Sequence, residues 1–424
     1  MADPRPLLSL EDALALLCAG AAPHTITQTQ VVSTFDALGR VLALGVTSQL
    51  DVPPQDNTSM DGYALRAADV AAPGTVLKVS QRIPAGVVGA PLQAGTAARV
   101  FTGAQVPAGA DAVVMQEQCE ALVSEAGDAL GRVRINVPAR TGQWVRRRGE
   151  DVRQGAVVLG RGARLTPQAL GLAASVGAAS LSVFRPPRVA VFSTGDELVM
   201  PGEPLKPGAI YNSNRFMLRG LLQAAGCVVD DLGIVPDRLD ATRQALRAAA
   251  LNNDLIITSG GVSAGEEDHL RPAVLAEGTL QNWQLAIKPG KPLAFGTVRR
   301  NVSDDSAPLG SALFIGLPGN PVSSYVTFLL AVMPVLRVLQ GGPGAMPSSL
   351  ASVADFDWPQ PDRRREFLRV RVNAQGRLEL FDNQSSGVLT SAVWADGLLD
   401  NPASQAIRRG DVVRYLPLAA LIHS

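Results

Sequence analysis

The chain has few of the side chains that hold transition metals or form disulfides. It contains three cysteines and three histidines in 424 residues. The cysteines, Cys18, Cys119 and Cys227, are odd in number and far apart, and none forms a CxxC pair. This spacing argues against a zinc site and against a disulfide framework. We expect buried thiols in the reducing cytoplasm.

The sequence also lacks an excess of charge and a long hydrophobic run. Lys plus Arg and Asp plus Glu number 38 each, so no global field draws the chain to nucleic acid or anionic lipid. The longest apolar stretch, Val326 to Leu336, is too short to cross a bilayer and contains Pro334. Near the amino terminus Glu11 and Asp12 interrupt the apolar run, which argues against a secretion signal, and Ser9 with Asp12 is typical of a helix cap. We expect a cytoplasmic protein without membrane or nucleic-acid partners.

The length indicates several domains, because one hydrophobic core seldom grows beyond about 250 to 300 residues. Short alternating segments separated by Gly and Pro predict a β-rich insertion, and strands that alternate with helices predict a mainly parallel α/β sheet. The predicted parts are a helical and linker domain split between 7–49 and 147–185, a β-rich insertion at 50–146, an α/β domain at 186–340 and a β-domain at 348–424.

Three predicted strands end in turns rich in Gly and Ser or Thr. They lie in the segments RVAVFSTGDEL (188–198), DLIITSGGVSAGEED (254–268) and LFIGLPGNPVSSY (313–325). Such turns at the carboxyl edge of an open α/β sheet form a ligand-binding crevice. The turn after the second strand offers backbone groups to an anion, and we name Ser259, Gly260, Gly261 and Ser263 as candidates.

Each candidate at this crevice has a plain structural explanation as well. Glu197 stands equally well as a metal or hydroxyl contact and as an acidic residue near a helix start, and Asp268 is a candidate for a divalent cation. The LPGNP turn, with Pro318 and Gly319, can cap a helix and bind an anion at the same time. Lys288 and Lys291 flank a turn fixed by prolines, which favours binding of a dianionic oxyanion or a pyrophosphate.

Polar turns of the β-rich insertion form a second group of candidates. Asp61 lies in an Asp-Gly turn and Thr102 in a strand-end turn, while Arg148 and Asp151 lie in a mixed charge run. Turn formation or solvation explains each of them alone. If they act together with the crevice, one active site must be built from two domains or from two subunits.

Eight motifs in one order resemble the molybdopterin molybdenumtransferase family, to which the enzymatic half of gephyrin belongs. They are PPQDNTSMDGYAL, FTGAQVPAGADAVV, RRRGEDV, FSTGDEL, IYNSN, TSGGVSAGEED, KPGKPLAFG and LPGNPVSS. The resemblance runs from about Leu7 to the carboxyl terminus. It implies a homodimer of four-part chains, with a molybdopterin-binding α/β domain and a carboxyl-terminal β-barrel.

The resemblance also implies an activity, the insertion of molybdenum from molybdate into adenylylated molybdopterin with release of AMP and with Mg²⁺ as cofactor. It implies catalytic roles for Asp61, Thr102, Glu197, Asp237 and Asp268, the metal ligands being Glu197 and Asp268. Substrate contacts fall to Arg148, Asp151, Lys288 and Lys291, to the turn residues named above, and to Ser385 and Ser386 in a weaker motif, QSSGVLTS. Where the family often has a branched residue the chain has Ala264. The dithiolene sulfurs of the pterin bind the soft metal, so no protein cysteine is needed.

Two other functions remain open from the sequence. One is a non-catalytic scaffold or carrier that binds molybdopterin, and the other is an adenylyltransferase, which would require only the α/β domain. For the molybdenumtransferase function, the resemblance implies two kinds of candidate partner. They are the adenylyltransferase that acts one step earlier and the proteins that modify the finished cofactor.

Overall fold

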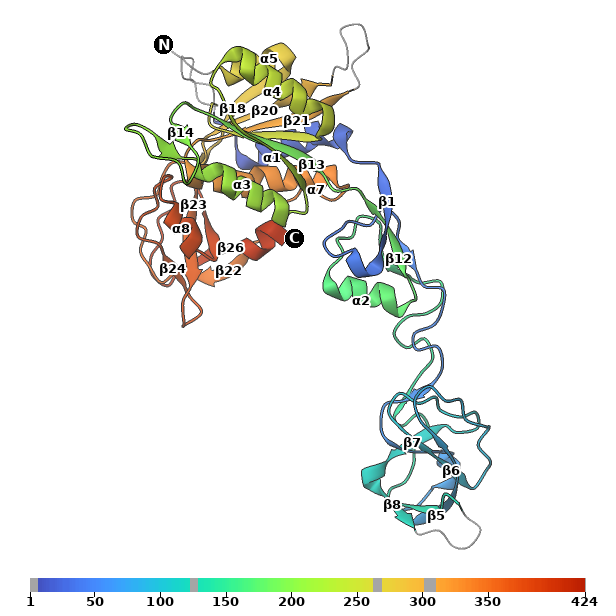
Figure 1. The fold of residues 1–424 in the computed structure, drawn as a ribbon. Helices are drawn as coiled ribbons and strands as arrows, with labels where there is room; N and C mark the ends of the chain where they lie inside the picture. Colours follow the sequence, from blue (N-terminus) through green and yellow to red (C-terminus); the bar gives the residue numbers. More distant parts are fainter. Residues whose placement is uncertain (1–6, 123–128, 262–268, 301–309, 424) are drawn as a thin grey trace. The chain divides into compact units, whose positions relative to one another are not determined.

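The computed structural model describes residues 7–122, 129–261, 269–300 and 310–423. The chain divides into two compact units (Figure 1). One unit comprises Val31–Val183, and the other comprises Met1–Gln30 together with Phe184–Ser424. The second unit is therefore made of two stretches of chain that are distant in sequence.

A six-stranded sheet forms the centre of the unit that contains the carboxyl terminus. Its strand order is β16 (Val228–Val235), β13 (Arg188–Thr194), β17 (Leu255–Ser259), β21 (Ser311–Leu317), β20 (Pro292–Arg299) and β18 (Gly278–Gln284). The first four strands are parallel, as the alternation of strands and helices predicts. β20 runs antiparallel to both of its neighbours, β21 and β18. The sheet is therefore mixed, with its parallel part at the predicted strand-end turns.

Helices cover both faces of this sheet, which explains why its central strands are apolar throughout. Alternate residues of β13 and β17 pack against α4 (Leu239–Asn252) and α5 (Leu270–Glu277) on one face. The other face packs against α1 (Leu10–Ala21), α3 (Ser213–Ala224) and a continuous helix of α6 (Pro321–Thr327), a π-turn (Phe328–Val332) and α7 (Met333–Leu339). In Figure 1 α4 and α5 lie on one side of the sheet, and α1, α3 and α7 on the other.

The first helix corrects one expectation. Ser9 caps α1 as predicted, because its Oγ accepts the Asp12 N–H at 3.0 Å. The prediction that residues 7–49 belong with 147–185 does not hold for α1, whose Leu10, Leu17 and Ala21 pack in the core of the six-stranded sheet. Beyond α1 the chain forms short strands and 3₁₀ turns rather than further α-helices as far as residue 50.

One helix, Pro321–Leu339, is long and apolar enough to cross a membrane by length and composition alone. Its most apolar window is 89% buried inside the protein. This burial is that of a core helix, because a helix packed on all sides is apolar all round.

A second sheet lies in the same unit. Its order is β19 (Ile287–Lys288), β23 (Arg365–Val372), β25 (Gly397–Asn401), β26 (Val412–Pro417) and β22 (Leu350–Val353), and β24 (Leu378–Leu380) also pairs with β23. Three of these strands, β23, β24 and β26, contain most of the alternating segments FLRVRV, RLEL and DVVRYL of the predicted β-domain. Two short helices, α8 (Leu389–Trp394) and α9 (Leu418–His423), complete this part. β19 comes from the α/β domain, and it pairs in parallel with β23. Lys288 is thereby attached to the carboxyl-terminal sheet.

The unit Val31–Val183 has its own sheet and cores. The sheet order is β7 (Ala112–Met115), β4 (Gly62–Leu65), β6 (Thr96–Val100), β5 (Thr75–Ile83), β9 (Arg132–Ile135) and β8 (Cys119–Leu122). Its two faces carry separate apolar clusters. A further small core surrounds α2 (Pro167–Ser175), with β2 (Val46–Thr47), β11 (Val157–Leu159) and parts of β1 (Thr29–Ser33) and β12 (Ser180–Phe184). In the same unit β3 (Asn57–Thr58) pairs with β10 (Val145–Arg146), whereas the pair β14 (Leu198–Val199) and β15 (Ile210–Tyr211) belongs to the unit that contains the carboxyl terminus.

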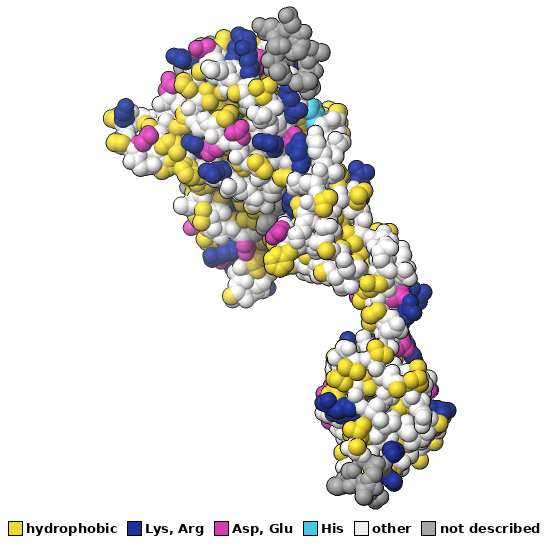
Figure 2. All heavy atoms as spheres, turned by 45° about the vertical axis from the view of Figure 1, so that its right-hand side comes forward, with side chains coloured by type: hydrophobic (Ala, Val, Ile, Leu, Met, Phe, Trp, Pro, Cys, Tyr) yellow, Lys and Arg dark blue, Asp and Glu magenta, His cyan; other side chains and the backbone are white. Residues whose placement is uncertain are grey.

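The charged surface and the cysteines can be compared with what the composition predicts. On the face that Figure 2 shows, basic and acidic side chains are interspersed, as expected for a chain without net charge. None of the three cysteines forms a disulfide. Cys227 is buried as expected, whereas Cys18 and Cys119 are only half-buried.

Candidate functional site

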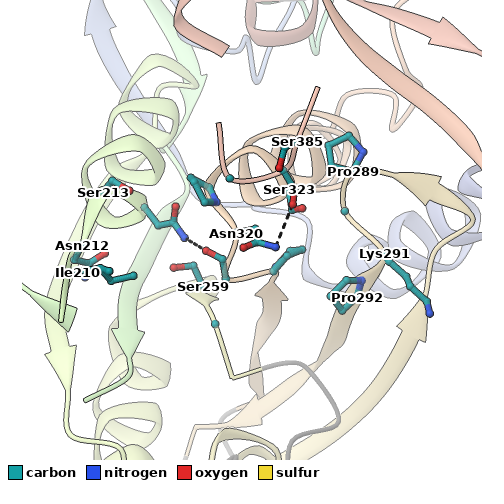
Figure 3. Close-up of a pocket in the computed structure, with 18 of the residues that line it drawn as sticks. Ile210, Asn212, Ser213, Ser259, Pro289, Lys291, Pro292, Asn320, Ser323 and Ser385 are labelled. Atoms are coloured by element: carbon teal, nitrogen blue, oxygen red, sulfur yellow. Dashed lines mark hydrogen bonds between the residues drawn. The ribbon is translucent and has the colours of Figure 1, made fainter. Parts of the chain in front are cut away.

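A cleft of about 980 Å³ opens at the carboxyl ends of β13, β17 and β21. It is the crevice that the three strand-end turns predict. The turn of KPGKP and the loop Gln384 to Gly387 form further walls (Figure 3). The α/β sheet and the carboxyl-terminal sheet thus both contribute to the same cleft.

Glu197 lies in the turn after β13, and its side chain is exposed. Its carboxylate folds back over Gly195, where a Cβ would lie 2.4 Å from Glu197 Oε2. Gly195 also has φ +142°, a conformation that favours glycine. Glycine at this position therefore lets the carboxylate sit against the backbone at the rim of the cleft.

The other two turns approach each other closely. A Cβ on Gly319 would lie 3.8 Å from the Cα of Gly260, and Gly260 has φ +92°. The N–H of Gly260, which was predicted to be open to an anion, already donates to the carbonyl of Leu317 at 3.0 Å. In the third turn the N–H of Val322 donates to the carbonyl of Ser386 at 3.0 Å. These two backbone N–H groups are therefore already used in joining the turns and the loop, and they are not open to an anion.

Two buried asparagines line the cleft at the start of α3. Asn212 caps the helix, because its Oδ1 accepts the N–H of Arg215 at 3.2 Å, while its Nδ2 has no partner among the described residues. Asn214 Nδ2 donates to the carbonyl of Gly319 at 2.7 Å, and its Oδ1 is likewise unpartnered in the described part of the chain. Both unpartnered atoms are buried, with almost no exposed surface. Buried polar atoms are seldom left without a partner, so these two amides are candidates for a ligand contact that follows a side-chain movement.

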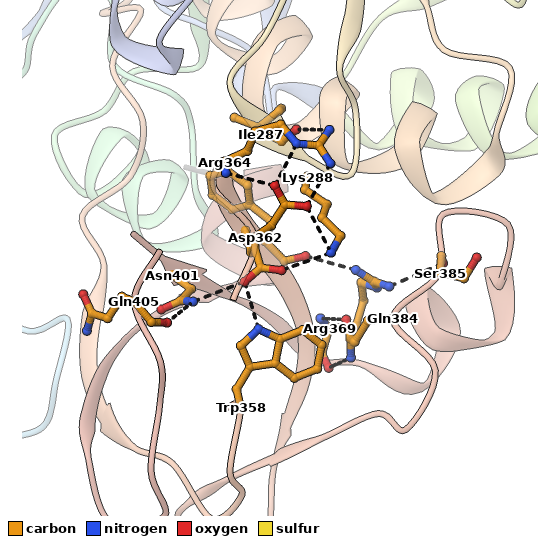
Figure 4. A network of polar contacts seen from close by, with 12 residues as sticks. Ile287, Lys288, Trp358, Asp362, Arg364, Arg369, Gln384, Ser385, Asn401 and Gln405 are labelled. Carbon is orange, nitrogen blue, oxygen red and sulfur yellow. Dashed lines mark hydrogen bonds and ion pairs between the residues drawn. The ribbon is translucent and has the colours of Figure 1, made fainter. Parts of the chain in front are cut away.

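The two lysines of the KPGKP turn differ in environment. Lys288 Nζ lies 3.3 Å from Glu366 Oε1 and 3.4 Å from Asp362 Oδ2 (Figure 4). Lys291 is exposed on the cleft wall, and it has no carboxylate partner among the residues that the structure describes. The turn itself requires glycine, because Gly290 has φ +105° and a Cβ there would lie 2.3 Å from Thr327 Oγ1. The two lysines occupy similar positions in the sequence motif, but in the fold only Lys288 is paired with carboxylates among the described residues.

Arg364 is a third cation at the cleft. Its Nε and Nη2 each donate to Asp362 at 3.0 Å, in a bidentate pair. These hydrogen bonds hold the pKa of the Asp362 carboxyl well below its usual range. Asp362 therefore stays ionised and is shared between Arg364 and Lys288.

The loop from Gln384 to Gly387 is held in place from two sides. Asn320 Nδ2 donates to Ser386 Oγ at 3.2 Å, and the fully buried Arg369 donates to the carbonyl of Ser385 at 3.4 Å. Burial lowers the pKa of Arg369 to about 10. Asn320 occupies the predicted cap position of α6, but its side chain makes no cap hydrogen bond and binds this loop instead.

The structure brings together most of the residues that the sequence proposed for the crevice. Those that line the cleft are Glu197, Ser259, Gly260, Lys288, Lys291, Pro318, Gly319, Ser385 and Ser386. Gly261 and Asp237 are described but do not line it, and Asp237 lies in the loop between β16 and α4. Ser263 and Asp268 lie outside the described residues, as does Ala264.

The candidates of the β-rich insertion lie in the other unit. Asp61 Oδ1 accepts the N–H and the hydroxyl of Thr102 at 2.7 and 2.8 Å, and the N–H bond lowers the pKa of Asp61. Arg148 Nε donates to Asp51 at 2.6 Å rather than to the nearby Asp151, which is exposed. The side chains of Asp61, Thr102 and Arg148 are thus held by partners within their own unit.

No cluster of three or more His, Cys, Asp or Glu side chains that could hold a metal occurs among the described residues. Of the carboxylates in that part of the chain, Glu197 alone lines the cleft. Magnesium commonly binds one or two carboxylates and completes its shell with water and substrate phosphates. A single exposed carboxylate beside the strand-end turns is compatible with that kind of site.

Several residues of the cleft were not identified from the sequence. Asn212 and Asn214 lie in IYNSN, where two amides beside an apolar strand were the available signal. Arg364 lies in a run of three arginines, which usually indicates a solvated surface. Trp358 and Glu366, behind Lys288, gave no signal, because only the pairing of β19 with β23 brings them near the cleft.

Comparisons with known proteins match the whole order of domains. The family model "MoeA N-terminal region (domain I and II)" matches residues 8–177, "Probable molybdopterin binding domain" matches 190–338, and "MoeA C-terminal region (domain IV)" matches 351–418. The matched segments leave only short stretches of the chain uncovered.

Similar proteins of full length are also known. The molybdopterin molybdenumtransferase of Haemophilus influenzae is 40% identical over 357 residues, covering 84% of each chain. Molybdopterin molybdenumtransferase 2 of Mycobacterium tuberculosis is 37% identical over 392 residues, covering 90% of this chain and 91% of that one. The crystal structure of the molybdopterin biosynthesis MoeA protein from Pyrococcus horikoshii OT3 superposes with a TM-score of 0.80 at 29% identity, covering 97% of this chain and 100% of that one. The chain belongs to the molybdopterin molybdenumtransferase family.

Proposed function

We propose that this chain inserts molybdenum from molybdate into adenylylated molybdopterin and releases AMP, in the cleft at the carboxyl edge of the six-stranded sheet. The observation that carries the proposal is the composition of that cleft. One wall holds Lys291 and Arg364, and the opposite turns hold Glu197 and unpartnered amides. Family membership supports the same reaction.

The cationic wall is the proposed site of molybdate. Molybdate is a tetrahedral dianion, which charged nitrogen donors and hydroxyl groups bind by short hydrogen bonds. Lys291 supplies the charge that no described carboxylate neutralises, Arg364 supplies donors beside its pair with Asp362, and Ser323, Ser385 and Ser386 supply hydroxyl groups. Lys288 contributes less charge, because its ammonium group is already paired with two carboxylates.

The strand-end turns are the proposed site of the adenylylated pterin. Heteroaromatic rings present donors and acceptors along their edges, and the free Nδ2 of Asn212 and Oδ1 of Asn214 match such an edge. Ser259, Gly260, Pro318 and Gly319 form the floor between these amides and the cationic wall. Gly261 and Ser263 remain candidates for the same ligand.

We assign Glu197 and Asp268 to a Mg²⁺ ion. When bound, the cation would neutralise charge on the phosphates and stabilise departing AMP. The position of Glu197 at the rim of the cleft, where Gly195 leaves room for its carboxylate, supports this assignment. Asp237 stays a catalytic candidate only by its position in the sequence.

The finer architecture belongs to the same proposal. We infer a homodimer of four-part chains, with the carboxyl-terminal sheet closing into a barrel and with Asp61, Thr102, Arg148 and Asp151 completing the site from a β-rich insertion. The boundaries are those expected from the sequence, apart from α1. A cytoplasmic location agrees with cysteines that form no disulfide. The enzymes that precede and follow in cofactor synthesis are the expected partners.

The purified protein, given adenylylated molybdopterin, molybdate and Mg²⁺, should release AMP and activate a molybdenum enzyme that lacks its cofactor. Glu197→Ala should slow AMP release more than it weakens pterin binding. Stoichiometric pterin binding without any turnover would favour the scaffold function instead. Release of pyrophosphate from ATP and unmodified molybdopterin would favour an adenylyltransferase.

A further inference from the structure

A buried carboxylate stands behind the cationic wall of the cleft. Glu366, on β23, is fully buried, and the parallel pairing of β19 with β23 places Lys288 in register with it. Its Oε1 lies 3.3 Å from Lys288 Nζ. Its Oε2 accepts Trp358 Nε1 at 2.8 Å and Asn401 Nδ2 at 3.4 Å (Figure 4). Both oxygens are therefore fixed, and one of them faces the lysine.

The lysine, in contrast, has access to solvent. The Lys288 side chain is 40% exposed, whereas Glu366 is 0% exposed. A lysine on a flexible stem can turn toward the cleft, but a buried carboxylate cannot follow it. Moving Lys288 toward an anion would leave a buried negative charge without its partner, which is unfavourable.

Carboxylates behind this wall already pair with two of the three cations that line it. Lys288, Lys291 and Arg364 line the cleft, and Asp362 and Glu366 lie behind them. Asp362 and Glu366 engage Lys288 and Arg364, and they leave Lys291 as the cation without a carboxylate partner among the described residues at this wall. Because Glu366 pairs with Lys288, the ammonium group of Lys288 is less available to the oxyanion.

Weak binding of the oxyanion has a catalytic advantage. Tight binding of a substrate in its ground state deepens the well from which reaction must start, and it does not raise the turnover rate. Molybdenum must pass from the molybdate site to the pterin. Restraint of Lys288 by the buried Glu366 weakens the binding of molybdate and therefore favours this transfer.

We propose that Glu366 is a positioning residue that restrains Lys288 and so limits the affinity of the cleft for tetrahedral oxyanions. The inference rests on the proposed function, since it names the restraint on the same molybdate site. It makes the carboxyl-terminal sheet the element that sets oxyanion affinity.

The test is Glu366→Gln, which keeps the side-chain length and an oxygen acceptor for Trp358 but removes the charge. Its amide N–H₂ then faces Lys288 Nζ, and Asp362, at 3.4 Å and already shared with Arg364, is the one carboxylate partner left to the lysine among the described residues. We expect the less restrained lysine to turn toward a bound oxyanion. One added charge-assisted hydrogen bond predicts molybdate binding that is roughly tenfold tighter, with a lower KM and a lower kcat for AMP release. Local unfolding would weaken binding, so a merely structural role predicts the opposite sign.

Glu379→Gln is the matched control. Glu379 lies on β24 of the same sheet, and it accepts Arg371 Nε at 2.9 Å away from the cleft. The exchange changes the net charge of the protein by the same amount, and we expect no change in molybdate affinity. Should Glu366→Gln fail to fold, Glu366→Asp draws the carboxylate away from Lys288 and should show a smaller gain in the same direction.

Three results would overturn the inference while AMP release by the wild type still supports the proposed function. One is unchanged or weaker molybdate binding by the folded variant. Another is an equal gain in the Glu379→Gln control. The third is a crystal structure of Glu366→Gln with molybdate in which Lys288 still faces residue 366 rather than the oxyanion. If the wild type itself neither binds molybdate nor releases AMP, the proposed function fails instead.

Discussion

At the scale of single residues, the cleft separates side chains that the sequence makes equivalent. Lys288 and Lys291 occur in one short motif, with a proline after each. In the fold one of them neutralises a buried acid and the other faces the cleft. Sequence reasoning identified the chemistry of the pair, but it could not assign the roles, because the acids come from residues more than 70 positions away.

The first prediction concerns Lys291. Lys291→Met should raise the KM for molybdate by roughly tenfold or more, because a charge-assisted hydrogen bond to the oxyanion is lost. The free energy of unfolding should stay within about 0.5 kcal/mol of the wild-type value, since the side chain is exposed. Steady-state kinetics and urea unfolding measure the two quantities. A large loss of stability with unchanged KM would reverse the assignment.

The second prediction concerns Lys288. Lys288→Met should lower the free energy of unfolding by about 2 kcal/mol, because the buried carboxylate of Glu366 loses its cation. The double variant Lys288→Met with Glu366→Gln should recover most of that stability, since neither charge remains. Urea unfolding of the single and double variants tests this. Additive losses would contradict the pairing.

At the scale of elements, the strands and helices of the α/β domain were predictable and their junctions were not. The apolar run of DLIITS predicts β17, and the Gly-rich turns predict the crevice at its end, since both depend on local pattern. The pairing of β19 with β23 depends on contacts between residues far apart in the chain. For the same reason α1 was grouped with its neighbours in sequence, although its apolar face packs on the distant α7.

The KPGKP turn gives a prediction at this scale. Gly290→Ala should destabilise the turn by about 1–3 kcal/mol, because the added Cβ meets Thr327 and the residue has positive φ. It should also raise the KM for molybdate by moving both lysines. Gly376→Ala is the control, since Gly376 has φ +73° in a turn with open space around it. That variant should lose only about 1 kcal/mol and keep its KM. Equal behaviour of the two variants would contradict the role of the turn.

Asp254, just before β17, gives a prediction about pH. Its carboxylate accepts Arg185 Nη1 and Nη2 at 2.7 and 2.8 Å and the Arg188 N–H at 2.9 Å. Burial raises the pKa of Asp254, but these hydrogen bonds outweigh burial and hold the pKa below its ordinary value. The stability that they contribute is therefore fully present above the unfolded pKa of about 4, and it is lost as the pH falls through the lower folded pKa.

Asp254→Asn tests this dependence. At pH 7 the variant should unfold with a free energy about 2 kcal/mol below that of the wild type. The difference should shrink below about pH 4, because the wild-type carboxyl becomes protonated as well. Urea unfolding across this pH range measures it. A difference that grows on acidification would contradict the assigned direction of the pKa.

At the scale of the whole molecule, the sequence motifs fall into two units, and the residues that the resemblance implies for one active site are divided between them. Glu197 and the lysines lie in one unit, whereas Asp61 and Arg148 lie in the other. The order of motifs was sufficient to identify the family, because eight of them occur in sequence along the chain. It could not assign Asp61 to the same subunit as Glu197 or to its partner.

Mixed oligomers test this assignment. If a homodimer builds each site from two subunits, Asp61→Asn and Glu197→Gln impair different halves of the same site. Unfolding and refolding the two inactive variants together should then restore part of the AMP release, since some mixed dimers carry one intact site. Each variant refolded alone is the control and should stay inactive. No recovery from proven mixed dimers would place both residues in the same subunit.

The most direct test of the central claim measures two products of the same reaction. Purified protein is incubated with adenylylated molybdopterin, Mg²⁺ and limiting molybdate, and pterin-bound molybdenum and free AMP are quantified together. We predict equimolar amounts that rise with the molybdate supplied, and that fall together when Lys291 is replaced by Met. AMP without pterin-bound molybdenum, or neither product, would contradict the claim that this cleft transfers molybdenum.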